Sequence, residues 1–134
     1  MYLLDTVVLS EMRKRNPDRG VVRWFADRNP TTLFISAVTI GEIERGAALK
    51  HPQDPVFAGA LTSWLDRLLV DYGDRIIPVD VAIARRWGQL GAVVGHMSAD
   101  LLIAATALEH GFAVVTRNVR HFVPTGGAVE NPFA

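Results

Sequence analysis

The chain contains no cysteine. This absence excludes a disulfide framework and any metal site built on thiolates, and it is compatible with the cytosol, where we expect the protein to reside. Long apolar runs are also missing, since no stretch approaches the roughly 20 residues that a membrane-spanning helix needs. The chain begins directly with a short strand-like segment and shows none of the features of a signal peptide.

There is no excess of charge of either sign, because lysine plus arginine and aspartate plus glutamate both total 14 residues. A strongly basic charge would suggest tight, non-specific binding of nucleic acid, and the balanced charge of this chain does not suggest such binding. Basic residues are nevertheless concentrated locally, and each cluster could contact phosphate or simply face solvent. The clusters are Arg13 to Arg15, Arg85 with Arg86, and Arg117 with Arg120.

Hydrophobic residues make up 49% of the 134 residues, enough for one domain with its own core. Short apolar segments alternate with longer segments of helical periodicity, which is typical of an α/β domain with a mostly parallel sheet. We therefore expect residues 1–134 to form a single domain with a central sheet of four to five short strands flanked by helices. The expected strands are residues 2–5, 33–36, 75–79, 112–115 and, at one edge, 128–130. The expected helices are residues 7–12, a segment around 21–25, then 39–49, 57–70, 81–94, a helix that starts at Ser98 or Ala99 and ends at His110, and a short turn at 119–122.

Four polar side chains with oxygen ligands lie where an expected strand ends or an expected helix begins: Asp5, Glu42, Asp100 and Asn118. The carboxyl ends of parallel strands meet at one edge of a sheet, where ligand and catalytic sites of such folds form. Three carboxylates gathered there would repel one another unless cations lay between them. Oxygen ligands suit Mg²⁺ or Mn²⁺, whereas the lack of cysteine and the scattered histidines argue against zinc. The pattern therefore predicts a divalent-metal site.

Each of these residues also has a purely structural interpretation. Asp5 could cap the first helix, and Glu42 fits a capping box that begins at Thr39. Asp100 could complement the dipole of its helix, and Asn118 could cap the turn that follows it.

Two further observations help to weigh capping against a site. Asp80 also stands at an expected helix start, and capping alone is enough to explain it. Asp100, in contrast, directly precedes the apolar run 101–107 and is therefore held near the interior, where an unpaired charge is costly. A bound cation would compensate that charge.

Four segments carry a resemblance to a known family: residues 4–11 (LDTVVLSE), 39–46 (TIGEIERG), 100–107 (DLLIAATA) and 115–122 (VTRNVRHF). Any one of them is a weak match, whereas all four in this order and at these separations are specific. In these segments the chain resembles the PIN-domain family, and within it the VapC-type toxins of type II toxin–antitoxin modules. The resemblance covers nearly the whole length.

This resemblance implies a PIN fold and a Mg²⁺- or Mn²⁺-dependent endoribonuclease that hydrolyses RNA phosphodiester bonds. Asp5, Glu42 and Asp100 stand at the family's acidic positions, and Asn118 stands at its fourth site position. Of these catalytic candidates, Asp5 and Asp100 are the expected metal ligands. The resemblance also implies a cognate antitoxin protein as partner and a homodimer.

The chain departs from the family pattern at two positions. Val7 stands where the family commonly has asparagine, which removes a polar group near the pocket. His121 replaces a common aspartate, and we expect it to affect its local helix more than the chemistry. Thr6 and Thr116 keep hydroxyls that would orient ligands or water.

Three other functions fit parts of the pattern. One is a structure-specific nuclease of the same fold, but the sequence has no additional helical arch or DNA-binding module to favour it. Another is a non-catalytic PIN-fold module that binds RNA or protein, which the loss of a carboxylate would have supported. A receiver-like phosphoacceptor domain would need an acidic pair after the first strand and a late lysine. Here Leu4 precedes Asp5, and no lysine follows Lys50.

Overall fold

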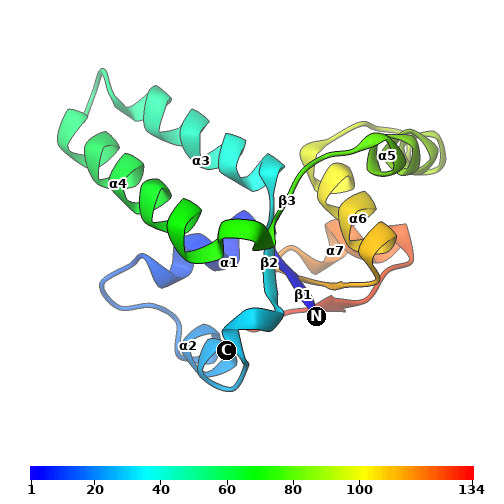
Figure 1. Cartoon of the computed structure of the whole chain (residues 1–134), viewed down its shortest axis with the longest axis horizontal. Coiled ribbons are helices and arrows are strands. Elements are labelled where there is room, and N and C mark those ends of the chain that lie inside the picture. Colours follow the sequence, from blue (N-terminus) through cyan, green and yellow to red (C-terminus); the bar gives the residue numbers. More distant parts are fainter.

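The computed structural model describes all 134 residues and contains a five-stranded sheet in which every neighbouring pair is parallel. The strand order is β3-β2-β1-β4-β5, so the first strand lies in the centre (Figure 1). The predicted α/β architecture with a parallel sheet is confirmed. The strands are β1 (Tyr2–Leu4), β2 (Leu33–Ser36), β3 (Ile76–Ile77), β4 (Ala113–Val115) and β5 (Val129–Glu130).

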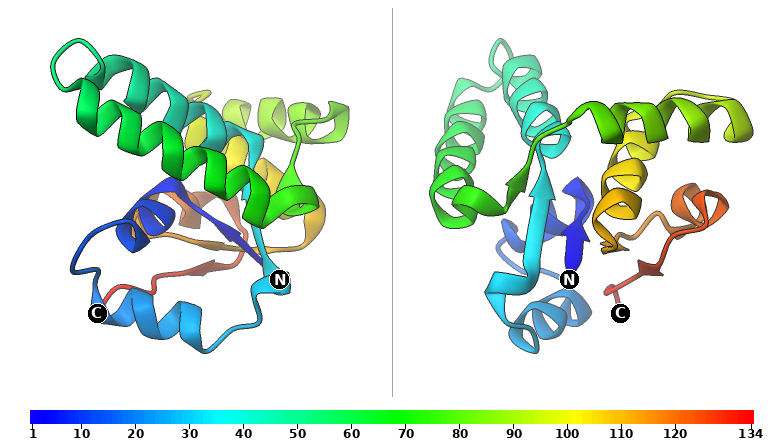
Figure 2. Two further views of the ribbon diagram at one scale, coloured as in Figure 1. Left: turned by 60° about the vertical axis from the view of Figure 1, so that its left-hand side comes forward. Right: turned by 45° about the vertical axis from the view of Figure 1, so that its right-hand side comes forward.

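Seven α-helices connect the strands and cover both faces of the sheet (Figure 2). The long helices α3 and α4 pack along each other on one side, and α5 packs against α6 on the other. The helices are α1 (Thr6–Met12), α2 (Arg19–Ala26), α3 (Ala37–Lys50), α4 (Pro55–Tyr72), α5 (Val81–Val94), α6 (Ala99–His110) and α7 (Val119–Phe122). Short 3₁₀ turns lie at Pro30–Thr32, Gly73–Arg75 and Val123–Thr125. None of the helices combines the length and the hydrophobicity that crossing a bilayer requires.

The central strand divides the core into two parts. Leu4 belongs to a cluster with residues of α1 to α4, whereas Leu3 belongs to a cluster with residues of α5 to α7. This division follows from the alternation of side chains along a strand, which sends successive residues to opposite faces. Both leucines are fully buried, so β1 is apolar on both sides and ends deep inside the molecule.

Helix ends mostly follow the local signals in the sequence. The Asp80 carboxylate accepts a hydrogen bond of 2.9 Å from the Ile83 amide, which confirms it as a cap of α5. Gly111 ends α6 with a φ of +70°, the left-handed conformation that glycine adopts without strain. The strand expected at residues 75–79 is shorter than predicted, because Arg75 belongs to a 3₁₀ turn and Pro78 has no amide to extend the ladder.

Candidate active site at the carboxyl end of the sheet

Asp5 lies at the end of the central strand and is only 4% exposed. The strand register continues up to this residue, because its amide donates to the Val115 carbonyl at 2.9 Å. One carboxylate oxygen, Oδ1, accepts a hydrogen bond from the Thr6 amide at 2.8 Å, and Oδ2 accepts one from the Thr116 hydroxyl at 2.8 Å. Asp5 therefore caps α1, as its capping interpretation predicts. Its other oxygen, Oδ2, is directed to Thr116 at the end of the neighbouring strand β4.

Thr116 links the end of β4 to the fourth predicted residue. It is fully buried directly after the strand, and its Oγ1 both donates to Asp5 and accepts a 2.9 Å hydrogen bond from the Asn118 amide. Asn118 occupies the cap position of α7, but its side chain makes no capping hydrogen bond. Its exposed side chain is therefore not committed to the helix that follows.

Glu42 reaches the site from α3. The helix begins at Ala37, with the Ser36 hydroxyl as its cap, so Thr39 lies inside the helix. The capping-box interpretation of Glu42 is therefore wrong, because the box requires Thr39 at the cap position. Glu42 Oε1 instead accepts a hydrogen bond of 2.7 Å from the hydroxyl of Thr6, in the first turn of α1.

Asp100 lies in the first turn of α6, whose cap is the hydroxyl of Ser98. Its Oδ2 lies 2.8 Å from Nδ1 of His121, which comes from α7. We expected His121 to affect its local helix more than the chemistry. The structure adds a direct contact between its ring and a predicted site carboxylate, which the sequence did not reveal. The two residues are 21 positions apart in the sequence, and no local sequence pattern predicts a contact over that separation.

The electrostatics of the site centre on Asp5. Burial raises the pKa of its carboxyl above the ordinary value of 3.8, and the nearby carboxylates of Asp100 and Glu42 raise the pKa further. The hydrogen bonds from Thr116 and Thr6 act in the opposite direction and stabilise the charged form. Asp5 takes part in none of the four ion pairs of the molecule, so its negative charge has no ionic partner within the protein.

The carboxylates form an open arrangement. No group of three or more acidic or histidine side chains is arranged so that it could hold a metal ion. Asp5 and Glu42 are connected through the amide and the hydroxyl of Thr6, and Asp100 approaches from the other face of the sheet on α6.

A family model described as the PIN domain matches residues 2–124, which is most of the chain. The chain belongs to the PIN-domain family. The four segments in which the sequence resembled this family all lie inside the matched range.

Relatives of this PIN domain match it over nearly their full length. VapC ribonuclease Y4jK of Sinorhizobium fredii is 34% identical over 99% of this chain and 98% of that protein. Toxin FitB of Neisseria gonorrhoeae is 31% identical over 99% of both chains. The crystal structure of FitAcB from Neisseria gonorrhoeae matches the fold with a TM-score of 0.86 at 33% identity, covering 98% of each chain.

In this PIN domain the four predicted site residues are brought to the carboxyl end of β1 and β4 by different elements. Hydrogen bonds connect Asp5, Glu42 and the backbone of Asn118 through the two threonines that the sequence singled out, Thr6 and Thr116. Asp100 joins them electrostatically, through its effect on the pKa of Asp5.

Proposed function

We propose that this PIN domain is the toxin of a type II toxin–antitoxin module and acts as a divalent-metal-dependent endoribonuclease in the cytoplasm. Residues 1–134 would act as one nuclease domain. The observation that carries this proposal is the buried Asp5 carboxylate, which is held by one hydroxyl and one amide donor. Asp100 and Glu42 raise its pKa, and it takes part in no ion pair. The ribonuclease and toxin names of relatives that cover the whole chain support it.

The residues of the site fit Mg²⁺ or Mn²⁺. A buried carboxylate next to two others is costly, and a hard cation with oxygen ligands offsets that cost. Mg²⁺ usually keeps several waters and binds only one or two carboxylates, so it does not require the group of three or more ligating side chains that this site lacks. Asp5 and Asp100 would hold the ion, with Glu42 and Asn118 bound through water. When bound, such an ion polarises a phosphoryl oxygen and lowers the pKa of bound water.

The chain's own residues have separate tasks in hydrolysis of an RNA phosphodiester. Thr116 fixes the orientation of Asp5 by donating to Oδ2, and Thr6 fixes that of Glu42. Glu42, which is exposed at the entrance of the site, can accept a proton from the attacking water. His121 positions the carboxylate of Asp100 through its ring nitrogen.

An active ribonuclease in the cell must be restrained, and we assign that task to a cognate antitoxin protein. One solved structure contains FitAB bound to the IR36 DNA fragment, and its matching chain is 31% identical to the present chain. By analogy the present toxin would form a complex with its antitoxin, and we further propose a homodimer. On α4, Val56 and Val70 are 84% and 80% exposed and offer apolar surface to such partners. Trp24 of α2, in contrast, is buried and belongs to the hydrophobic core.

Cleavage of mixed tRNA and rRNA by the purified chain tests the proposal. We expect cutting that requires Mg²⁺ or Mn²⁺, stops in EDTA, and is lost in Asp100→Asn. Asp80→Asn is the matched control, because Asp80 also begins a helix and asparagine caps nearly as well as aspartate. Cutting that persists in EDTA and in Asp100→Asn would refute this site, and a chain that binds RNA without cutting it would be the non-catalytic module.

A further inference from the structure

A pocket lined mostly by polar residues adjoins the proposed metal site on the side of Asp100. It has a volume of about 280 Å³ and lies between the turn that joins α5 to α6 and the segment α7 with its following 3₁₀ turn. Asp100 forms part of its wall together with His96, Arg120 and His121. The pocket and the proposed metal site therefore share a carboxylate.

The walls of this pocket combine flat cationic or aromatic groups with apolar surface. His96 and His121 supply imidazole rings, Arg120 supplies a guanidinium plane, and Val94 and Pro124 supply the apolar sides. Arg120 takes part in none of the four ion pairs of the molecule, so its guanidinium is free for a ligand. Proteins recognise single-stranded RNA by stacking unpaired bases on histidine rings and arginine planes and by hydrogen bonds to the base edges.

The turn that carries His96 is held in place by its surroundings. The indole of Trp87 donates to the Ser98 carbonyl at 3.2 Å, and the Ser98 hydroxyl caps α6. Gly91 of α5 lies so close to Met97 that an added Cβ would overlap the Met97 sulfur. This wall of the pocket is therefore formed before a ligand arrives, which lowers the entropic cost of binding.

We propose that this pocket accepts the base of a nucleotide next to the phosphate that is cleaved, with His96 and Arg120 determining base preference. The inference rests on the proposed ribonuclease function, because it needs a scissile phosphate beside Asp100. A base stacked between these side chains fixes which phosphodiester lies at the carboxylates. His121 serves both places, since it contacts Asp100 and lines the pocket.

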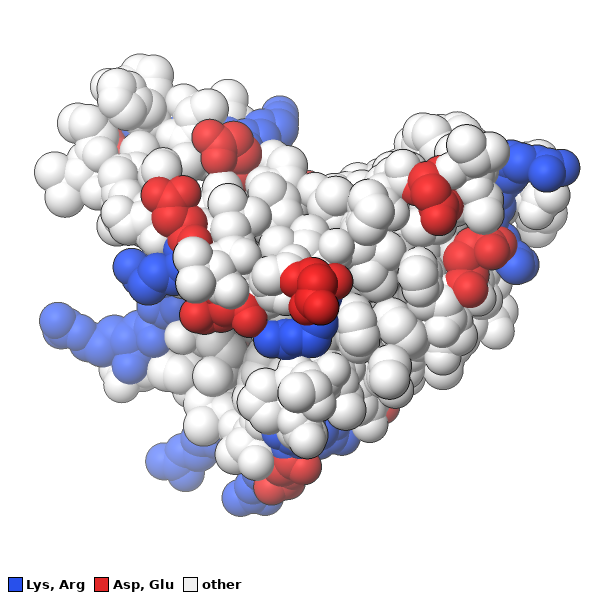
Figure 3. Space-filling view, in the orientation of Figure 1, with Lys and Arg blue, Asp and Glu red and all other residues white.

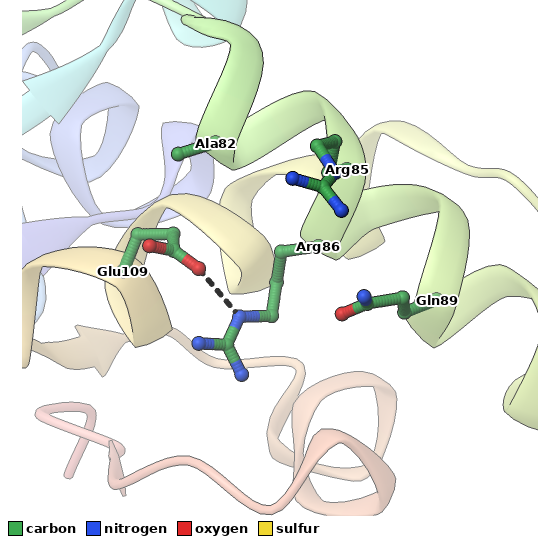
Figure 4. Close-up of a pocket in the computed structure, with 5 residues that line it drawn as sticks. All are labelled: Ala82, Arg85, Arg86, Gln89 and Glu109. Atoms are coloured by element: carbon green, nitrogen blue, oxygen red, sulfur yellow. Dashed lines mark hydrogen bonds and ion pairs between the residues drawn. The ribbon is translucent and has the colours of Figure 1, made fainter.

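A second pocket of similar size provides a matched control. It has a volume of about 290 Å³ and lies on α5 and α6, with Arg85, Arg86 and Gln89 on one wall and Glu109 on the other (Figure 4). Arg86 is paired to Glu109 at 2.8 Å, whereas Arg85 has no ionic partner. Glu109 lies about two and a half helical turns along α6 from Asp100, so this pocket is remote from the proposed chemistry. Figure 3 shows basic side chains at the end of the molecule that α5 occupies.

The test uses the full chain, a library of single-stranded RNA with randomised positions, and sequencing of the cleaved ends. Wild type, His96→Ala, Arg120→Ala and Arg85→Ala are compared in Mn²⁺, with Arg120→Gln as a second variant of that position. Binding of a fluorescent RNA with the preferred sequence is measured in an Asp5→Asn background. Each variant is first checked for an unchanged Tm.

We expect His96→Ala and Arg120→Ala to reduce the base preference at one position beside the cut by about five-fold or more, which is the usual effect of a lost base-stacking contact. RNA binding should weaken by a similar factor, while Arg85→Ala stays within about two-fold of wild type. Unchanged preference in all variants, or weaker binding with an unchanged preference, would overturn the assignment of a base to this pocket and leave the ribonuclease intact. A wild-type chain that neither cuts nor binds RNA would overturn the proposed function as well.

Discussion

Asp5 combines two properties that ordinarily conflict, because its carboxylate is buried and lies beside two other carboxylates. Its pKa is raised by burial first and by Asp100 and Glu42 next, and it is lowered by the Thr116 and Thr6 hydrogen bonds. The fold thus keeps an ionisable carboxyl at a position where its charge destabilises the folded protein. Residues that are unfavourable for folding but arranged with defined partners are typical of functional sites.

Neutralising this residue should stabilise the metal-free protein. A carboxyl whose pKa is raised by folding binds its proton more tightly in the folded state, so stability is lost as the pH rises above the ordinary pKa of 3.8. Asp5→Asn should therefore raise the free energy of unfolding at pH 7 without metal. Urea unfolding at pH 7 and pH 3.5 measures this. The gain should vanish at the lower pH, and an Asp5→Asn protein that is less stable than wild type at pH 7 would contradict the account.

The Thr116 hydroxyl should set the acid limit of activity. Because its hydrogen bond lowers the pKa of Asp5, its removal in Thr116→Val should raise that pKa and move the acid limb of the cleavage rate to higher pH. Thr116→Ser keeps the hydroxyl and is the control. Initial rates measured from pH 4.5 to 8 separate the outcomes: the same shift in both variants would show that the hydroxyl is not responsible.

At the scale of elements, the boundaries that were predictable depend on local signals. The strand at residues 33–36 was predicted with the observed bounds, and the helix expected to start at Ser98 or Ala99 and end at His110 starts at Ala99, since each is an apolar segment between clear breaks. The start of α3 was missed, because Ser36 at the end of β2 serves as the cap and Thr39 only mimics one. The contact of Thr6 with Glu42 spans 36 residues and depends on tertiary packing, which no local pattern encodes.

Two glycines should respond to the same substitution with opposite sign. Gly111 ends α6 with a φ of +70°, so Gly111→Ala should cost about 1 kcal/mol of stability. Gly88 is exposed inside α5 and has open space at its Cβ position, so Gly88→Ala should stabilise by about 0.5–1 kcal/mol. Thermal unfolding of both variants checks this pair. A stabilising Gly111→Ala would show that α6 does not need its left-handed end.

At the scale of the whole molecule, the parallel sheet is what turns distant residues into a site. The composition and the alternation of segments were enough to predict the α/β fold and the gathering of Asp5, Glu42 and Asn118 near one sheet edge. They were not enough to predict the contact of His121 with Asp100, or the pocket that these two residues share with the α5–α6 turn. Both depend on how α7 packs against α6.

Metal should stabilise the entire fold by mass action. A ligand that binds only the folded state at 100 times its Kd adds about 2.7 kcal/mol to the free energy of unfolding. The Tm of wild type should therefore increase with Mn²⁺ concentration, whereas that of Asp5→Asn should not. A differential scanning calorimetry series checks this, and an equal increase in both proteins would place the metal elsewhere.

The most direct test of the account is the affinity of the chain for Mn²⁺, measured by the EPR signal of the free ion during titration. We predict saturable binding by wild type, a loss of at least about ten-fold in affinity for Asp5→Asn and for Asp100→Asn, and wild-type affinity for Asp80→Asn. No saturable binding by wild type, or the same affinity in all four proteins, would contradict the claim that Asp5 and Asp100 form a metal site.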